Sequence, residues 1–483
     1  MAERQKSLKK NFLMNVLLTL SNFIFPLITF PYVSRILLPI GTGRVTFAVS
    51  LISYFVMFAQ LGIPTYGIRA VAKVRDDREK LTRTVQELFI INLVMSAAAY
   101  ALLLIALFTV PRLFEDRTLY LIVSLNIFFS LIGIEWMYKG LEQYTYITVR
   151  SIIFKFIALI AMFVLIHKQA DYVIYGGISI FASSASAVLN FINARRYISL
   201  KPTGGYSFRP HLKAVAIFFA MAVATTVYTN LDVVMLKFMT TDADVGYYNA
   251  AVKVKIILVS IVTSLGAVLL PRASYYVEHH EMDRFHEITG KALNFVFLFA
   301  APVSLYFTLF ARPGILFLSG RAYGGSVLPM QIIMPTVLFI GITNILGIQV
   351  LVPTNREKHV LYSEIIGAVT DIVLNALLIP RMHAAGAAVG TLAAELSVLI
   401  YQYAVLRKEM RSSFKAVHYV RILIGLVLGA AASCWVPILN LNNFVTLLIS
   451  AVLFFGVYGG WLALLKEPLV LESAATIKKK LKH

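Results

Sequence analysis

The sequence is poor in charged residues and in cysteine. Only 14% of its 483 residues are charged and 59% are hydrophobic, whereas a soluble globular domain carries roughly 25% charged residues. A soluble core cannot bury so much apolar surface, so most of it is expected to face lipid. Cys434 is the one cysteine, which excludes an intrachain disulfide and a cysteine-based metal site.

Several enzyme signatures are also missing. The sequence has no G-x-x-x-x-G-K-[ST] loop and no H-E-x-x-H motif, and its histidine spacing supports no Ser-His-Asp triad. We therefore predict no catalytic residues, no cofactor and no metal. The longest loop on the predicted outer side is short and lies between Arg312 and Ser326. This argues against a membrane glycosyltransferase, which would usually need a long outer loop.

Apolar segments of roughly 20 residues recur along the whole chain, as expected of membrane-spanning helices. The sequence therefore predicts an all-α polytopic membrane protein. We expect about fourteen spanning helices, near residues 12–38, 43–66, 85–110, 118–138, 149–167, 172–194, 213–237, 246–270, 290–311, 326–350, 360–380, 384–406, 418–437 and 443–465.

Basic residues are concentrated in alternate loops. About 24 Lys and Arg lie in five regions, which are the N-terminal tail, 69–83, 195–213, 407–415 and the tail from Lys466. The loops on the other side hold about seven. The positive-inside rule therefore places both termini in the cytoplasm. It also accounts for the net charge of +20 without nucleic-acid binding.

The chain repeats itself at a spacing of about 203 residues. Arg35, Gly43, Gly62 and Arg69 in the first half correspond to Lys237, Gly246, Gly266 and Arg272 in the second. The repeat predicts two six-helix lobes, an architecture that transporters commonly build around a midline cavity. The expected domains are an N-terminal lobe at 1–205, a C-terminal lobe at 206–412, two additional helices at 413–466 and a basic cytoplasmic tail at 467–483.

Several predicted spans carry polar side chains at helical spacing. Ionisable groups are costly inside a bilayer, so we expect them to face a partner or a hydrated cavity. The candidates for substrate binding in that cavity are Arg35, Lys155, Asn249, Lys253, Asn375 and Gln402. The candidates for coupling to a proton or sodium ion are Asp232, Glu364, Asp371 and Glu395. For Arg35, anchoring at the membrane interface is an equal alternative to phosphate capture.

Six motifs resemble segments of Wzx-type polysaccharide flippases. They are TFPYVSRILLPIGTGRVTFAVSLI (29–52), QLGIPTYGIRAVAK (60–73), LDVVMLKFMTTDADVGYYNAAVKVK (231–255), VLLPRASYY (268–276), GIQVLVPTNREK (347–358) and LNALLIPRMHAAGAAVGTLAAE (374–395). The motifs are distributed along nearly the whole chain, and their order and spacing together carry the resemblance. One departure is Thr42, which stands where an aromatic residue is common. The sequence is therefore similar to the multidrug/oligosaccharidyl-lipid/polysaccharide exporter superfamily.

This resemblance implies two six-helix lobes arranged in a V, with two added helices, in a bacterial inner membrane. It implies that the chain flips undecaprenyl-diphosphate-linked oligosaccharide to the outer leaflet by alternating access, for O-antigen, capsule or exopolysaccharide assembly. The expected partners are this lipid, a coupling proton or sodium ion, membrane lipids, and a polysaccharide polymerase with its chain-length regulator. The alternatives are a lipid II flippase for peptidoglycan, a drug/cation antiporter of the same superfamily, and a membrane glycosyltransferase.

Overall fold

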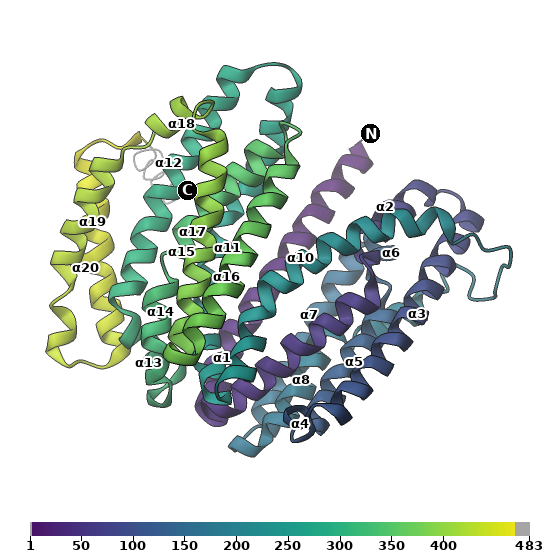
Figure 1. Cartoon of the computed structure of the whole chain (residues 1–483). Coiled ribbons are helices and arrows are strands. Elements are labelled where there is room, and N and C mark those ends of the chain that lie inside the picture. Colours follow the sequence, from purple (N-terminus) through teal and green to yellow (C-terminus); the bar gives the residue numbers. More distant parts are fainter. Residues whose placement is uncertain (1, 469–483) are drawn as a thin grey trace. The chain divides into compact units, whose positions relative to one another are not determined.

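The computed structural model describes residues 2–468, and all regular structure in this range is helical (Figure 1). The predicted all-α membrane fold is thereby confirmed. The chain forms two compact units, Met1–Lys237 and Phe238–His483. Their boundary falls later than residue 205, where the repeat places the lobe boundary, so the division into lobes stays a prediction. Of the predicted basic tail, residues 469–483 lie outside the described residues.

The first unit is built from the helices that precede Lys237. They are α1 (Ala2–Gln60), α2 (Ile63–Val74), α3 (Arg78–Thr109), α4 (Pro111–Phe114), α5 (Arg117–Gly133), α6 (Glu135–Gly140), α7 (Tyr144–Leu165), the 3₁₀ turn η1 (Gln169–Asp171), α8 (Tyr172–Ser184), α9 (Ala187–Ala194) and most of α10 (Arg209–Met239).

The second unit contains the remaining helices. They are α11 (Asp242–Glu278), α12 (Met282–Leu309), α13 (Ala311–Ser319), η2 (Arg321–Ser326), α14 (Val327–Ile333), α15 (Thr336–Thr343), the π-helical turn η3 (Asn344–Leu351), α16 (Glu357–Met382), α17 (Ala384–Leu406), α18 (Arg411–Lys415), α19 (Tyr419–Ser433), η4 (Val436–Leu439) and α20 (Asn443–Leu464).

The described residues contain twelve helical stretches long and apolar enough to cross a membrane, or thirteen if one bent pair is counted as a span. The predicted number of fourteen is therefore not confirmed. Two predicted helices, 12–38 and 43–66, fall within one 62-residue stretch, Leu13–Val74. The predicted helix 326–350 corresponds to the bent pair, whose parts meet at 42°.

The long first helix is interrupted at Leu38. The stretch Leu13–Val74, which includes most of α1 and all of α2, would extend about 93 Å as one straight helix, roughly three times the thickness of the hydrocarbon core. Leu38 has a φ of 58° and a ψ of 177°, and Pro39 follows it. The backbone of α1 is therefore non-helical at the turn that we predicted between the first two spans.

The break between α1 and α2 requires glycine. Gly62 has a φ of +74°, and a Cβ atom there would lie 2.5 Å from the backbone carbonyl carbon of Phe218 in α10. A side chain would thus be strained and would clash with the α10 backbone. Gly62 therefore allows α10 to pack closely against the break between α1 and α2.

The segment between α9 and α10 is fastened to α3. Gln86 Nε2 donates hydrogen bonds to the carbonyl oxygens of Ser199 and Lys201, both at 2.9 Å. Gln86 Oε1 accepts a bond from the Tyr206 hydroxyl at 2.9 Å. The neighbouring Glu87 Oε1 accepts one from the Ser207 amide at 2.7 Å. Two adjacent side chains of α3 thus hold the start of α10 within the first unit.

Candidate functional site

A row of buried residues on α16 faces α17 in the second unit. The buried positions recur every four residues, so they lie along one side of the helix. They are Ser363, Gly367, Asp371, Asn375 and Ile379. On α17, a Cβ atom at Gly390 would lie 2.2 Å from Asn375 Oδ1 and 3.0 Å from Asp371 Oδ1. The missing side chain at Gly390 therefore lets the polar groups of α16 reach the α17 backbone.

Polar side chains of α17 and α11 extend this row. The Tyr248 hydroxyl of α11 lies 2.8 Å from Thr391 Oγ1, which also donates to the Ala387 carbonyl at 3.0 Å. Glu395 follows Thr391 by one helical turn and is buried. We call Tyr248, Asp371, Asn375, Thr391 and Glu395 the polar cluster. It joins α11 to the consecutive helices α16 and α17, which follow it by about 80 residues or more in the sequence.

The polar cluster holds two carboxyl groups that are almost fully enclosed. Asp371 is 3% exposed and Glu395 is 7% exposed. Both lie in candidate membrane spans, Glu357–Met382 and Ala384–Leu406. An ionised carboxylate in such surroundings is costly unless a proton or a cation neutralises it. The chemistry open to the polar cluster is therefore exchange of a proton or binding of a small cation.

The other predicted site residues of the second unit are not members of the polar cluster. Asn249 is buried on α11, next to Tyr248, and Lys253 is half-buried one turn further along. Gln402 Nε2 donates to Ser363 Oγ at 3.0 Å, near the other end of the buried row. Glu364 is exposed. The buried row advances in four-residue steps, so Ser363 rather than Glu364 occupies the buried side of α16 there.

Three predicted residues lie in the first unit. Arg35 is exposed on α1, and its Nη1 donates to the Pro31 carbonyl at 2.9 Å. Lys155 of α7 is buried, and its Nζ bonds Ser21 Oγ at 2.7 Å and also Asn22 Oδ1. Asp232 is buried on α10. Lys155 is therefore a predicted cation that two neighbouring polar side chains hold in place.

Sequence reasoning missed a polar pocket in the first unit. The pocket has a volume of about 250 Å³ and is lined by residues that include Glu135, Trp136, Lys139, Arg150 and Asn190. Arg150 is 6% exposed and lies in the candidate span Tyr144–Leu165. An arginine inside a predicted span is a signal that could have identified this pocket. Lys155 is the one residue of that helix that the sequence analysis predicts as a site residue.

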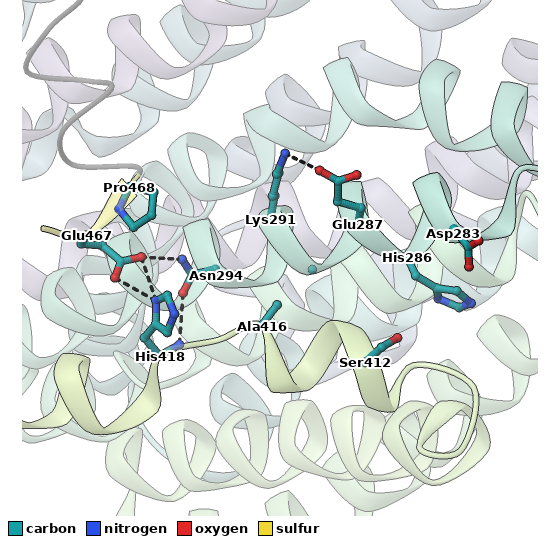
Figure 2. Close-up of a pocket in the computed structure, with 11 residues that line it drawn as sticks. Asp283, His286, Glu287, Lys291, Asn294, Ser412, Ala416, His418, Glu467 and Pro468 are labelled. Carbon is teal, nitrogen blue, oxygen red and sulfur yellow. Dashed lines mark hydrogen bonds and ion pairs between the residues drawn. The ribbon is translucent and has the colours of Figure 1, made fainter.

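A second pocket, of about 510 Å³, lies where α12, α18 and α19 meet the segment after α20 (Figure 2). Glu467 is fully buried there, and its Oε1 accepts a 2.9 Å hydrogen bond from Asn294 Nδ2. His418 Nδ1 lies 2.8 Å from the other carboxylate oxygen, Oε2. Figure 2 shows the Lys291–Glu287 ion pair on another side of the pocket. Glu467 thus fixes the chain after α20 to two helices of the second unit.

Comparison with known proteins identifies the family. The family described as "Polysaccharide biosynthesis protein" matches residues 8–277, more than half of the chain. The chain belongs to this family. The resemblance to polysaccharide flippases that the motifs suggested is thereby confirmed.

Two relatives of this polysaccharide biosynthesis protein are both described as "Putative O-antigen transporter". The one from Escherichia coli (strain K12) is 24% identical over 394 residues, which cover 81% of this chain and 95% of the relative. The one from Shigella dysenteriae is 25% identical over 411 residues, with 82% and 98% covered. The similarity therefore extends along nearly the full length of both relatives.

Two solved structures share the fold of this family member. The lipid II flippase MurJ in an inward closed conformation matches with a TM-score of 0.70 at 16% identity, over 95% of this chain and 100% of that one. An inward-facing multidrug resistance MATE transporter of the MOP superfamily matches with a TM-score of 0.66 at 12% identity, over 81% and 95%. The chain therefore has a MurJ- and MATE-like fold.

Proposed function

We propose that this protein flips a lipid-linked oligosaccharide from the cytoplasmic to the outer leaflet of the bacterial inner membrane. The observation that carries the proposal is the polar cluster, which places two buried carboxyl groups inside candidate spans. Membership of a polysaccharide biosynthesis family and the relatives described as O-antigen transporters support the cargo class. A polar head group cannot cross hydrocarbon unaided, so a protein path for it is needed.

The cargo we propose is an undecaprenyl-diphosphate-linked oligosaccharide. Arg35, Lys155 and Lys253 are the cations that would neutralise its diphosphate, and Asn249, Asn375 and Gln402 would hydrogen-bond its sugars. The pathway we propose is assembly of O-antigen, capsule or exopolysaccharide. A polymerase with its chain-length regulator would consume the product.

The movement we propose is alternating access by rocking of two lobes, with both termini in the cytoplasm. Asp371 and Glu395 are the proposed coupling groups in the second unit, and Asp232 is a further candidate in the first. Binding of a proton or a sodium ion at Asp371 and Glu395 would favour one conformation, because it removes the cost of a buried negative charge. The outward movement of cargo would then draw on an ion gradient.

The test is flipping by purified full-length protein in proteoliposomes that contain a lipid-linked oligosaccharide with a fluorescent sugar. The expected result is loss of fluorescence to a membrane-impermeant quencher on the side opposite to loading, at a rate that depends on a proton or sodium gradient. Asp371→Asn should slow this movement. Equal rates in protein-free liposomes would overturn the proposal.

The alternatives have their own readouts in the same vesicles. Faster movement of lipid II than of the oligosaccharide lipid would favour the peptidoglycan flippase. Export of a cationic dye without movement of either lipid would favour the drug antiporter. Transfer of sugar between two added lipids would favour the glycosyltransferase.

A further inference from the structure

The pocket of the first unit contains an arginine with unused hydrogen-bonding capacity. A guanidinium has five N–H donors. Arg150 Nη1 donates to the Ser186 carbonyl at 2.9 Å, and the guanidinium lies 5.6 Å from the centre of the Tyr146 ring. Its Nε–H is buried and has no acceptor among the described residues. One bond to a carbonyl does not require an arginine, so the remaining donors need another explanation.

Arg150 also gives the pocket lining its net positive charge. Glu135 and Lys139 line the same pocket and bond each other at 2.8 Å. Their charges offset each other, and the other residues that line the pocket are uncharged. The pocket therefore has an excess of one positive charge. A buried guanidinium that no carboxylate bonds is costly inside a membrane span, which favours a site that takes an anion.

The pocket offers an acceptor as well as donors. Asn190 is 1% exposed, and its Nδ2 donates to the Gly133 carbonyl at 2.7 Å. Its Oδ1 is buried and receives no hydrogen bond from the described residues. A bare oxyanion satisfies only the arginine. A ligand that has both an oxyanion and a hydroxyl group satisfies both side chains.

The predicted depth of the pocket in the bilayer is close to that of the lipid head groups. Arg150 lies six residues after Tyr144, where α7 begins, so it is about 9 Å from that end of the helix. Glu142, just before α7, pairs at 2.6 Å with Arg75 of the predicted cytoplasmic segment 69–83. In the predicted orientation the pocket is therefore near the cytoplasmic surface, where phosphate groups of the inner leaflet lie.

We propose that the pocket lined by Arg150 and Asn190 binds a phosphate ester that carries hydroxyl groups. The guanidinium pairs with the phosphate oxygens in the planar geometry that arginine favours, and a hydroxyl donates to Asn190 Oδ1. A phospholipid head group such as phosphoglycerol and a soluble polyol phosphate share this chemistry. The sugar diphosphate of the proposed cargo does too. The assignment rests on the proposed function only if the ligand is the sugar diphosphate of the cargo.

Trp136 provides a direct reporter because it lines the pocket and is one of only three tryptophans. The experiment uses full-length protein with Trp435→Phe and Trp461→Phe, in phosphatidylcholine nanodiscs. Glycerol 3-phosphate is titrated while the emission of Trp136 is recorded. Inorganic sulfate, which has the oxyanion without a hydroxyl, and glycerol, which has hydroxyls without the oxyanion, serve as single-feature probes. A parallel series replaces part of the phosphatidylcholine with phosphatidylglycerol. Saturation by the soluble ester or by the lipid identifies the source.

We expect a saturable emission change with glycerol 3-phosphate or phosphatidylglycerol, and none with glycerol. Arg150→Gln should weaken binding by about tenfold or more, because it removes a charge-assisted hydrogen bond. Arg150→Lys should retain part of the affinity, since it keeps the charge and loses the planar donors. Equal responses in Arg150→Gln and the parent, or no saturable change with either ester, would overturn the assignment.

Two rim variants keep the test decisive if Arg150→Gln fails to fold. Their side chains are 45% exposed at Glu135 and 33% exposed at Lys139. Glu135→Gln frees the positive charge of Lys139 and should tighten binding about threefold, whereas Lys139→Gln frees the negative charge and should weaken it by a similar factor. Shifts in the same direction would contradict an anion site. None of these measurements requires transport, so an inactive flippase and an empty pocket are distinguishable outcomes.

Discussion

Glu87 of α3 and His211 of α10 are joined by a 2.8 Å contact between Oε2 and Nε2. His211 Nδ1 lies 2.8 Å from the Tyr66 hydroxyl of α2, so the histidine ring bridges two helices. Arg83 Nε donates to the same carboxylate at 3.2 Å. The buried carboxylate of Glu87 thus collects three donors, including the Ser207 amide, where the chain enters α10.

Replacement of Glu87 should loosen the start of α10. Glu87→Ala leaves Ser207, His211 and Arg83 without their common acceptor, so we expect a loss of about 2 kcal/mol in unfolding free energy. The measurement is thermal unfolding in detergent, with hydrogen exchange of residues 199–208. Glu79→Ala on the exposed first turn of α3 is the matched control. Unchanged exchange in the Glu87 variant would contradict a fastening role.

Gly390 should tolerate no side chain. Gly390→Ala places a methyl group 2.2 Å from Asn375 Oδ1, so either α17 or the polar row of α16 must shift. We expect a loss of about 1–3 kcal/mol and reduced yield of folded protein, as for other overpacked cores. Gly460→Ala on α20 meets nothing within 4 Å and should behave as wild type. Equal melting temperatures for the two variants would argue against the close approach of α16 and α17.

The two acidic residues of α16 should differ in their effect on transport. Asp371 is buried in the polar cluster, whereas Glu364 is exposed. Asp371→Asn removes the charge without a change of size, and we expect flipping to lose its dependence on the ion gradient and to slow by about tenfold or more. Glu364→Gln should remain within about twofold of wild type. The measurement is the initial flipping rate with and without a gradient, and a reversed order of the two variants would sink the coupling assignment.

The predicted orientation can be tested with single cysteines. Cys434→Ser removes the one native thiol, which is exposed. Asp76→Cys and Glu115→Cys then place exposed thiols in a loop predicted to be cytoplasmic and in one predicted to be outside. In intact cells a membrane-impermeant maleimide should label the variant at 115 and spare the variant at 76 until the cells are opened. The opposite pattern would invert the topology.

The helices could be predicted because lipid offers no partners to backbone groups, so spans must be helical and apolar. Even 118–138 and 149–167, which polar residues interrupt, coincide with candidate spans Arg117–Gly140 and Tyr144–Leu165. The break at Leu38 is a local backbone feature that hydropathy does not report. It accounts for part of the difference in the number of spans.

The partners of polar side chains were harder to predict because they depend on how helices meet. Glu364 and Asp371 are seven residues apart and share a face on an ideal helical wheel. The buried row that contacts α17 instead advances in four-residue steps and leaves Glu364 exposed. Arg150 of α7 is surrounded by residues of α6 and α9, which lie before and after α7 in the sequence. The spacing of residues within one helix does not show which other helices pack against it.

The part of the α16 row from Asp371 to Ile379 has an apolar counterpart in the first unit. Ala158 and Met162 of α7, and Ile166 directly after it, are buried at the same four-residue spacing as Asp371, Asn375 and Ile379, 213 residues earlier. Under the proposed function, this row contributes its ion chemistry once per chain. It would thus limit how much electrical charge accompanies each cargo molecule.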